Sequence, residues 1–250
     1  MRKSEFYNIS KDDIFHLGPY ASQPLAHPQP IHNERAELET FMRTAHATVL
    51  TLLAVLNAHL DLPLGTLVDL HKLHCTGGDQ ARITHAPPVA SDVITLGEHT
   101  DFGSITILFN QLGGLQVMNP SSREWKYVRP VPGSAIVNLG DALVKLAGRD
   151  RLYSGLHRVV GPPGEQAGAV RHSVVYFARP NGDVKLRSLF GDEEDGEGEV
   201  LTADEWIKQR ARLRNKANFE GAKTFEASRG TEHHVNKAGL DRPAAHVEVV

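Results

Sequence analysis

The first regular pattern of hydrophobic positions lies between residues 33 and 60. Apolar side chains recur there every three or four residues, which places them on one face of an amphipathic helix. We therefore predict a helix over residues 33–60, followed by a shorter helix over residues 65–73. The repeated positions of the longer helix are Leu38, Met42, His46, Val49, Leu53 and Leu56.

A different pattern begins near residue 80. Short runs are alternately apolar and polar, or wholly apolar, and clusters of Gly, Pro, Asn and Ser separate them. Many short strands without long helices between them predict a mainly β fold with flanking helices, as a sandwich, barrel or jelly roll over about residues 80–190. Residues 110–114 and 119–122 have the composition of hairpin turns. The predicted strands are 80–84, 105–109, 115–118, 125–128, 135–138, 156–160 and 173–177.

The two ends of the chain lack this strand pattern. Residues 1–32 are expected to be an irregular N-terminal segment, because several prolines interrupt them. Residues 203–214 have a helical pattern and are expected to cover the sheets, whereas the acidic residues 191–199 are typical of a solvated loop. Residues 228–250 contain few apolar side chains and are expected to be a disordered tail. We therefore expect one domain, over residues 33–227.

Composition narrows the class of protein. The chain has 250 residues, with 27 Lys and Arg against 30 Asp and Glu, which gives a net charge of −3 without a long basic run. We therefore expect neither a nucleic-acid partner nor binding to an anionic membrane. Cys75 is the single cysteine, which fits a reducing compartment. The longest apolar stretch, residues 48–56, is too short to cross a bilayer. We expect a monomeric, cytoplasmic protein that acts on a small molecule.

Two His-x-Asp pairs are candidates for metal binding, and local geometry separates them. His59 and Asp61 lie at the end of the predicted helix, where residues i and i+2 point about 200° apart. His99 and Asp101 lie between predicted strands, where residues i and i+2 project to the same side of an extended backbone. Only the second pair can therefore chelate one ion without further rearrangement.

A third metal ligand and an anion site complete this chemistry. His157 lies on a predicted strand that a jelly roll can bring beside the first pair, although an ordinary half-buried histidine would also fit this position. Two imidazoles and one carboxylate on one face of an octahedron are the ligands of non-haem Fe(II) oxygenases. Arg171 and Ser173 share one face of the last predicted strand, where a guanidinium and a hydroxyl could bind a carboxylate of a co-substrate or of the protein.

Other polar residues were weighed against ordinary structural roles. His71, His74 and Cys75 resemble a zinc cluster, but too few ligands are available and we do not expect a zinc site. Asp141 could be a catalytic carboxylate, but it is expected instead to cap a short helix over residues 142–147. Candidate substrate-contacting residues are Arg82, Phe102, Leu115 and Phe177, although core packing would explain the three apolar ones equally well.

Five segments together resemble a known family. They are residues 97–108 (GEHTDFGSITIL), 113–117 (GGLQV), 138–141 (NLGD), 157–159 (HRV) and 171–173 (RHS). Their order and approximate spacing resemble those of the isopenicillin N synthase-like 2-oxoglutarate/Fe(II) dioxygenases, and the resemblance extends over about residues 35–215. It is closest to fungal members, many of which act in secondary metabolism.

The resemblance implies a fold and a reaction. The fold would be a double-stranded β-helix, the cupin-like form of the jelly roll. His99, Asp101 and His157 would bind Fe(II), and Arg171 and Ser173 would bind the distal carboxylate of 2-oxoglutarate. With O2 as the oxidant, the co-substrate would be converted to succinate and CO2, and a small organic substrate would be hydroxylated, desaturated or cyclised.

Two departures from the family pattern concern the pocket. Family members carry roughly 80 further residues before the matched region, about the size of half a domain, so this chain would have an unusually open pocket or be a shortened member. Many members read Arg-x-Asn-Tyr-Tyr-Pro where this chain reads RITHAP at residues 82–87, which places Thr84 and Ala86 where Asn and Tyr often contact 2-oxoglutarate.

Two alternatives to a 2-oxoglutarate-dependent oxygenase stay open at this point. One is an Fe(II) oxidase of the isopenicillin N synthase type that uses no 2-oxoglutarate, with Arg171 and Ser173 holding a substrate carboxylate instead. The other is a shortened relative that binds a metal or ligand without turnover. The sequence does not identify the substrate.

Overall fold

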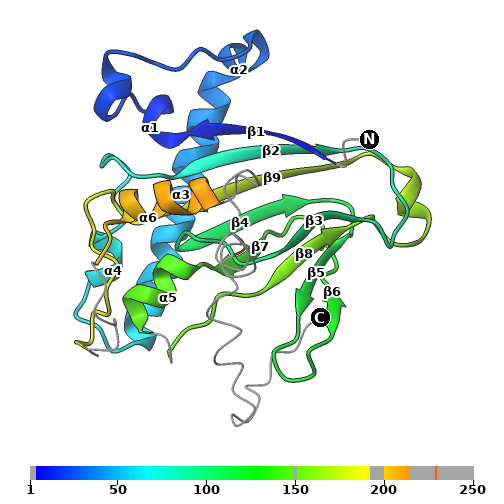
Figure 1. Ribbon diagram of the computed structural model, residues 1–250. Coiled ribbons are helices and arrows are strands. Elements are labelled where there is room, and N and C mark those ends of the chain that lie inside the picture. Colours follow the sequence, from blue (N-terminus) through cyan, green and yellow to red (C-terminus); the bar gives the residue numbers. More distant parts are fainter. Residues whose placement is uncertain (1–3, 149–150, 192–199, 214–228, 230–250) are drawn as a thin grey trace.

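Two antiparallel sheets form the frame of the protein, as the computed structural model shows (Figure 1). The structure describes residues 4–148, 151–191, 200–213 and 229. The two-sheet arrangement is the double-stranded β-helix that the family resemblance implied. The larger sheet has the order β1 (Glu5–Ser10), β2 (Gln80–Ala86), β9 (Arg171–Ala178), β4 (Ile105–Asn110) and β7 (Ile136–Leu139), and the smaller sheet has the order β3 (Ile94–His99), β8 (His157–Val160), β5 (Leu115–Met118) and β6 (Trp125–Tyr127).

The chain passes from one sheet to the other between β4 and β5. The turn composition of residues 110–114 predicted a hairpin here, and this prediction was wrong, because β4 pairs with β7 and β9 whereas β5 pairs with β6 and β8. A turn composition marks a change of direction but does not choose the partner strand. The hairpin predicted at residues 119–122 does join β5 to β6, and the Asn119 side chain accepts bonds from two backbone N–H groups in its turn.

The two faces of the larger sheet differ in character. Because side chains alternate along a strand, Tyr176 and Ala178 share one face of β9 with Ile105 and Ile107 of β4, and all four are buried. Residues on the opposite face are more polar and face the space between the sheets. They include Arg82 and Thr84 of β2, Thr106 of β4, Asn138 of β7, and Arg171 and Ser173 of β9.

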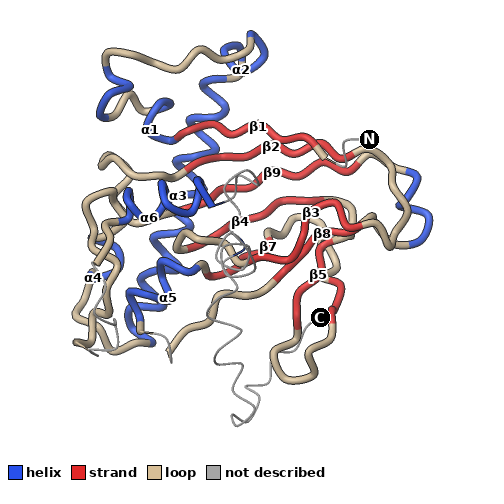
Figure 2. Tube along the Cα trace, in the orientation of Figure 1, coloured by secondary structure: helices blue, strands red, loops and turns tan. Residues whose placement is uncertain are grey.

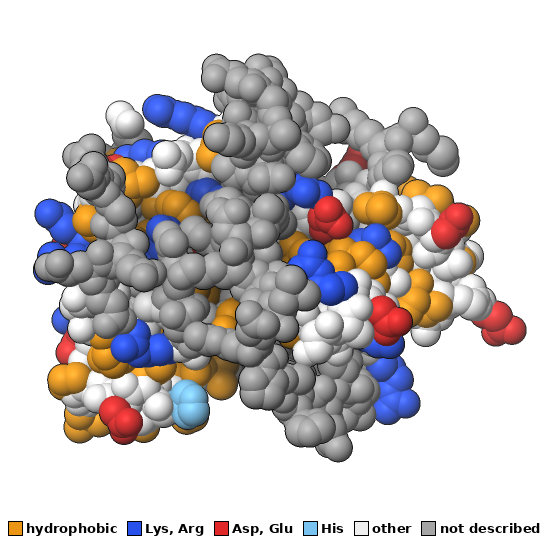
Figure 3. Space-filling view, turned by 60° about the horizontal axis from the view of Figure 1, so that its bottom comes forward, with side chains coloured by type: hydrophobic (Ala, Val, Ile, Leu, Met, Phe, Trp, Pro, Cys, Tyr) orange, Lys and Arg blue, Asp and Glu red, His pale blue; other side chains and the backbone are white. Residues whose placement is uncertain are grey.

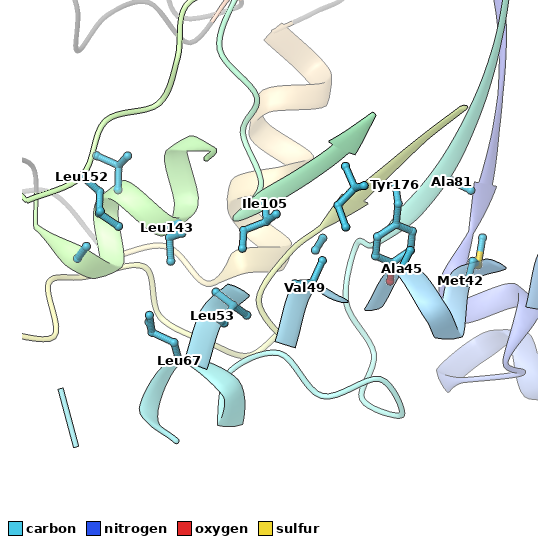
Figure 4. Close-up of a cluster of buried hydrophobic side chains, with 14 of the residues drawn as sticks. Met42, Ala45, Val49, Leu53, Leu67, Ala81, Ile105, Leu143, Leu152 and Tyr176 are labelled. Atoms are coloured by element: carbon cyan, nitrogen blue, oxygen red, sulfur yellow. The ribbon is translucent and has the colours of Figure 1, made fainter. Parts of the chain in front are cut away.

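The apolar face of the larger sheet is covered by helix α3 (Arg35–His59), within the range predicted for the first helix. Met42, Val49 and Leu53 of α3 are fully buried, and Figure 4 shows them with Tyr176 in one cluster. By length and hydropathy α3 could also cross a membrane. Its burial against the sheet is the ordinary arrangement of a core helix, and each such buried side chain contributes about 1.5–3 kcal/mol.

Smaller helices flank one end of the sheets (Figure 2). The second predicted helix, residues 65–73, is shorter than expected and forms only α4 (Thr66–Asp69). Helix α5 (Asp141–Ala147) follows β7, and α6 (Ala203–Leu213) matches the predicted C-terminal helix. Trp206 and Ala203 of α6 pack against α5. The acidic residues 192–199 and the tail 230–250 lie outside the described residues.

The first 32 residues are more regular than predicted. After β1 come α1 (Lys11–Ile14), the 3-10 helix η1 (Gly18–Ala21) and α2 (Gln29–Asn33). The prediction relied on the prolines, but all six residues of β1 pair with β2. The ammonium of Lys11 is fully buried, lies 2.9 Å from an Asp12 carboxylate oxygen, and donates to the carbonyls of Leu73 and Cys75. These distant partners order the segment.

Candidate metal centre

Three side chains from two distant parts of the sequence converge between the two sheets. His99 ends β3, Asp101 follows it by two residues, and His157 begins β8. One ligand atom of each lies within 4.8 Å of the others. The Nε2 atoms of His99 and His157 lie 3.9 and 4.0 Å from Oδ1 of Asp101. Among the described residues, this is the only such group of three or more His, Cys, Asp or Glu.

Backbone carbonyls orient both imidazoles. Nδ1 of His99 donates to the carbonyl of Gly97 at 2.8 Å, and Nδ1 of His157 donates to the carbonyl of Gly155 at 2.9 Å. In each ring a proton on Nδ1 leaves Nε2, the atom nearer Oδ1 of Asp101, able to bind a metal. Such hydrogen bonds fix the tautomer and the orientation of a histidine ligand.

The carboxylate of Asp101 is held by two polar side chains from the larger sheet. Oδ2 accepts hydrogen bonds from the Thr106 hydroxyl at 2.7 Å and from the Asn138 amide at 2.9 Å, while Oδ1 faces the histidines. Burial raises the pKa of Asp101, but His157, His99 and these two hydrogen bonds outweigh that effect and lower the pKa to about 2. The carboxylate is therefore ionised and prepared for a cation.

The loop that carries Asp101 rests on the start of α5. Two backbone N–H groups of this helix, from Asp141 and Ala142, donate to the carbonyls of Asp101 and Gly103. Gly140 lies so close to this loop that a Cβ there would overlap the Gly103 carbonyl oxygen, and only glycine fits. The NLGD segment therefore positions the metal ligand.

Asp141 was predicted to cap the short helix, and this prediction was wrong. Asp141 is the first residue of α5, and Gly140 precedes the helix. The Asp141 carboxylate accepts a bond from the Thr100 hydroxyl at 2.9 Å and pairs with Arg210 of α6 at 3.3 Å. It thus fixes the residue between His99 and Asp101, which sequence spacing could not show.

The expected anion site lies on β9. Arg171 and Ser173 are both buried, and the Arg171 guanidinium donates to the Gly113 carbonyl at 3.0 Å and to the Ser173 hydroxyl at 3.5 Å. Within the described residues, no Asp or Glu oxygen forms an ion pair with Arg171. Burial lowers the pKa of Arg171, because the charged form loses hydration. An anion would compensate for that loss.

The residues that depart from the family pattern lie beside this arginine. In the pairing of β2 with β9, Thr84 is opposite Ser173 and Ala86 is opposite Arg171. Directly paired residues project to the same side of a sheet. Thr84 and Ala86 therefore lie beside Arg171 and Ser173, the residues of the expected anion site.

The candidate substrate residues fall into two groups. Arg82, Phe102 and Phe177 line one small pocket that also reaches Asp101. The Arg82 guanidinium lies 5.0 Å from the centre of the Phe177 ring, and its Nε donates to Asn8. Leu115 is not among the residues that line this pocket; it is buried on β5, where it pairs with Val159.

The other histidine motifs do not form a further group of metal ligands among the described residues. His71 donates to the Leu67 carbonyl and accepts from the Ser104 hydroxyl, and it is fully enclosed. In the described part of the chain, it forms no group of metal ligands with His74 and Cys75. His59 and Asp61 likewise form no such group there.

The donor atoms present fit Fe(II). Two neutral imidazoles and one carboxylate that converge from one side leave the remaining positions of an octahedron open to other ligands. The buried guanidinium of Arg171, on the face of the larger sheet that also carries Thr106 and Asn138, fits a co-substrate with a carboxylate end. The roles of Thr106, Asn138 and Gly113 were not predicted, although all three belong to the segments that carry the family resemblance.

Comparisons with known proteins agree with this geometry. Residues 78–180 match the 2OG-Fe(II) oxygenase superfamily. A 2-oxoglutarate-dependent dioxygenase of Aspergillus fumigatus is 33% identical over 191 residues, which are 68% of this chain and 49% of that protein. The proline hydroxylase buaE of Petromyces alliaceus is 35% identical over 196 residues, which are 72% of this chain and 59% of that protein. This chain thus spans about half the length of such curated relatives.

The fold has a counterpart among solved structures. A full-length protein of Neurospora crassa, crystallised in complex with alpha-KG, superposes with a TM-score of 0.71 and 25% identity. The match covers 84% of this chain and 66% of that one. From the matched family, the fold and the converging ligands together, this chain belongs to the 2OG-Fe(II) oxygenase superfamily.

Proposed function

We propose that the protein is a non-haem, Fe(II)- and 2-oxoglutarate-dependent dioxygenase. It oxidises a small organic molecule by hydroxylation, desaturation or cyclisation, in secondary metabolism. The observation that carries this proposal is the convergence of His99, Asp101 and His157 on one point, together with a buried Arg171 on β9 of the larger sheet. Arg171 has no carboxylate partner among the described residues. The first feature suits a ferrous ion, and the second suits the free carboxylate of the co-substrate.

The metal-binding residues have separate roles in the proposed reaction. Fe(II) would supply the activation of O2 and the coordination of the keto acid. His99 and His157 offer Nε2 to the ion because their Nδ1 protons are engaged by carbonyls, and Asp101 offers Oδ1 because Thr106 and Asn138 occupy Oδ2.

A second group of residues binds and shields the reactants. Arg171 donates from its guanidinium to the distal carboxylate of 2-oxoglutarate, and the Ser173 hydroxyl adds a further donor. Phe102 and Phe177 border the pocket next to Asp101 and limit the access of water to the reacting atoms.

The proposed class of substrate is inferred from the names of similar proteins. The Neurospora crassa protein has also been crystallised with thymine, and buaE is named as a proline hydroxylase. Thymine and proline are both small polar molecules. We propose a substrate of similar size that enters beside Arg82, Phe102 and Phe177.

The proposal also includes the partners, the oligomeric state and the cellular location of the enzyme. A net charge of −3 supports a small-molecule partner over nucleic acid or an anionic membrane. On the face seen in Figure 3, described basic and acidic side chains are interspersed, which is consistent with this view. We propose a monomer, and the single Cys75 supports a reducing, cytoplasmic location.

The decisive experiment measures succinate. The purified chain would be incubated anaerobically with Fe(II), 2-oxoglutarate and a panel of small heterocycles and amino acids, and then exposed to O2. We expect succinate formation that one member of the panel stimulates, in step with an oxidised product. The Asp101→Ala variant is the control for uncatalysed decay of 2-oxoglutarate.

Two results would overturn the proposal. Product formation without succinate would assign the chain to the Fe(II) oxidases and make Arg171 a substrate-binding residue. Iron binding with no O2 consumption across the panel would assign it to non-catalytic relatives.

A further inference from the structure

Two exposed histidines lie side by side on the outer face of the larger sheet. His85 of β2 and His172 of β9 are direct register partners on antiparallel strands. Both are exposed, and the centres of their rings are 5.3 Å apart with an angle of 57° between the ring planes. Their face is the one that α3 covers further along the strands. The centre formed by His99, Asp101 and His157 lies on the other side of the sheet.

The spacing of these rings suits one tetrahedral ion. Zinc binds an imidazole nitrogen at about 2.0–2.1 Å, which places the ring centre about 3.2 Å from the ion. Two ring centres 5.3 Å apart then subtend about 110° at a common ion, which is the tetrahedral angle. The strand pairing therefore already sets the separation that a two-histidine chelate needs.

A third donor lies on the next strand. Glu5 of β1 is the register partner of His85, so Glu5, His85 and His172 form one row across three strands on the same face. All three are exposed, so their side chains can rotate. Their ligand atoms do not all lie within 4.8 Å of one another as those of His99, Asp101 and His157 do, and binding an ion would require such a rotation. A carboxylate beside two imidazoles adds negative charge and an oxygen ligand, and water can occupy the fourth position.

We propose that His85 and His172, with Glu5, form a second metal site for zinc or a related late first-row divalent ion. Imidazole suits Zn, Ni and Cu, whereas Fe(II) binds such sites more weakly in the usual order of affinities. The site joins β2 to β9. Because His172 stands between Arg171 and Ser173, bound metal would stabilise the two strands whose other face carries the anion site.

The test separates zinc binding at this site from binding at the group of His99, Asp101 and His157 and at the two adjacent histidines His233 and His234. Zinc would be titrated by calorimetry into the full chain carrying His99→Ala, Asp101→Ala, His233→Ala and His234→Ala. We expect one zinc per chain. In that background His85→Ala or His172→Ala should weaken binding by about tenfold or more, since two-ligand chelation is lost. His59→Ala, which removes a single exposed histidine at the end of α3, should have no effect.

Stability gives an independent readout. Zinc should raise the midpoint of thermal unfolding of the background protein, because a ligand that binds only the folded state stabilises it. That increase should disappear in His172→Ala. Glu5→Gln should weaken zinc binding by a smaller factor than either histidine variant, and unchanged affinity would remove Glu5 from the ligand set.

The proposal fails if no zinc binds to the background protein, or if His85→Ala and His172→Ala bind zinc as well as their parent does. If circular dichroism shows that the background protein is unfolded, the same two variants are made with the triad intact. The number of zinc ions bound should then fall by one, and an unchanged number would overturn the proposal. Neither result depends on oxygenase activity.

Discussion

His99 and His157 face each other across adjacent antiparallel strands as register partners of β3 and β8, with ring centres 4.3 Å apart. A shift of either strand by one residue would turn one imidazole to the other face of the smaller sheet. The register of this strand pair, together with the loop that places Asp101, therefore determines whether a metal can bind.

Removing the carboxylate ligand should abolish turnover without unfolding the chain. In Asp101→Ala the two imidazoles remain, but the only anionic ligand of the group is lost. We expect loss of succinate formation and of tight Fe(II) binding, with an unchanged circular dichroism spectrum. His99→Ala should cause the same losses as Asp101→Ala. Asp69→Ala, at an exposed aspartate of α4, is the matched control. Retained activity in both ligand variants would contradict the assignment.

The side chains that hydrogen-bond to Asp101 should increase the affinity for Fe(II). Thr106→Val removes the hydroxyl that donates to Oδ2 and keeps the shape, and Asn138→Ala removes the amide donor. Each should weaken Fe(II) binding by about 10–100-fold, the usual effect of residues that orient a metal ligand. The measurement is a metal titration monitored by activity and by calorimetry.

The control for these variants is Thr51→Val on the exposed face of α3, where the hydroxyl bonds only within the helix. Equal metal affinity in Thr106→Val, Asn138→Ala and the parent would show that Asp101 needs no such support.

The guanidinium on β9 should determine the affinity for the co-substrate. Arg171→Gln removes the charge, and we expect the KM for 2-oxoglutarate to rise about 10–100-fold, as expected for lost hydrogen bonds to a charged group. Arg171→Lys should recover only part of this affinity, because an ammonium lacks the planar pair of donors. The kcat at saturating 2-oxoglutarate should change less.

An exposed arginine provides the comparison. Arg43→Gln on α3 breaks a surface ion pair with Glu39 and a contact with the Phe15 ring, both outside the anion site, and should leave the KM unchanged. A KM for 2-oxoglutarate that is the same in Arg171→Gln and in the parent would assign Arg171 to the substrate or to the fold.

Buried histidines should make the fold sensitive to acid. Burial lowers the pKa of His71 to about 4, and burial also lowers the pKa of His46, whose Nε2 donates to the His71 carbonyl. Asp79 lies near both and opposes the shift. Below about pH 6.5 the unfolded chain takes up protons that the folded chain excludes. The free energy of unfolding should therefore fall between about pH 6.5 and 4, by up to about 3 kcal/mol for His71.

Urea unfolding between about pH 7.5 and 5 measures this dependence. His71→Asn should be less stable at the upper end of this range, because hydrogen bonds to Leu67 and Ser104 are disturbed, but its stability should fall less as the pH is lowered. His59→Asn, at an exposed position, should keep the parental slope. A His71→Asn slope equal to that of the parent would show that folding does not lower the pKa of His71.

Local patterns in the sequence anticipated much of the structure. Periods of two and of about 3.6 residues depend only on neighbours, so the strands from β4 to β9 and the helix α3 were located close to their observed bounds. The pair of His99 and Asp101 was also local, since two residues separated by one position can share a side wherever the backbone is extended.

Other features depended on partners far away in the chain. β1 is ordered by its pairing with β2 and by the contacts of Lys11 with residues 73 and 75, none of which the composition of residues 1–32 reveals. The crossing from β4 to β5 was mistaken for a hairpin for the same reason. The bonds of Asp141 to Thr100 and Arg210 likewise required the packing of α5 and α6.

The sequence alone determined which chemical groups are present and how each segment alternates, because these are properties of neighbouring residues. Only the tertiary structure decided that His157 lies opposite His99, that Thr106 and Asn138 hold Asp101, and that Arg171 is buried without a protein carboxylate in the described chain. Strand register and burial are set by the packing of segments that are remote in sequence, and no local pattern contains that information.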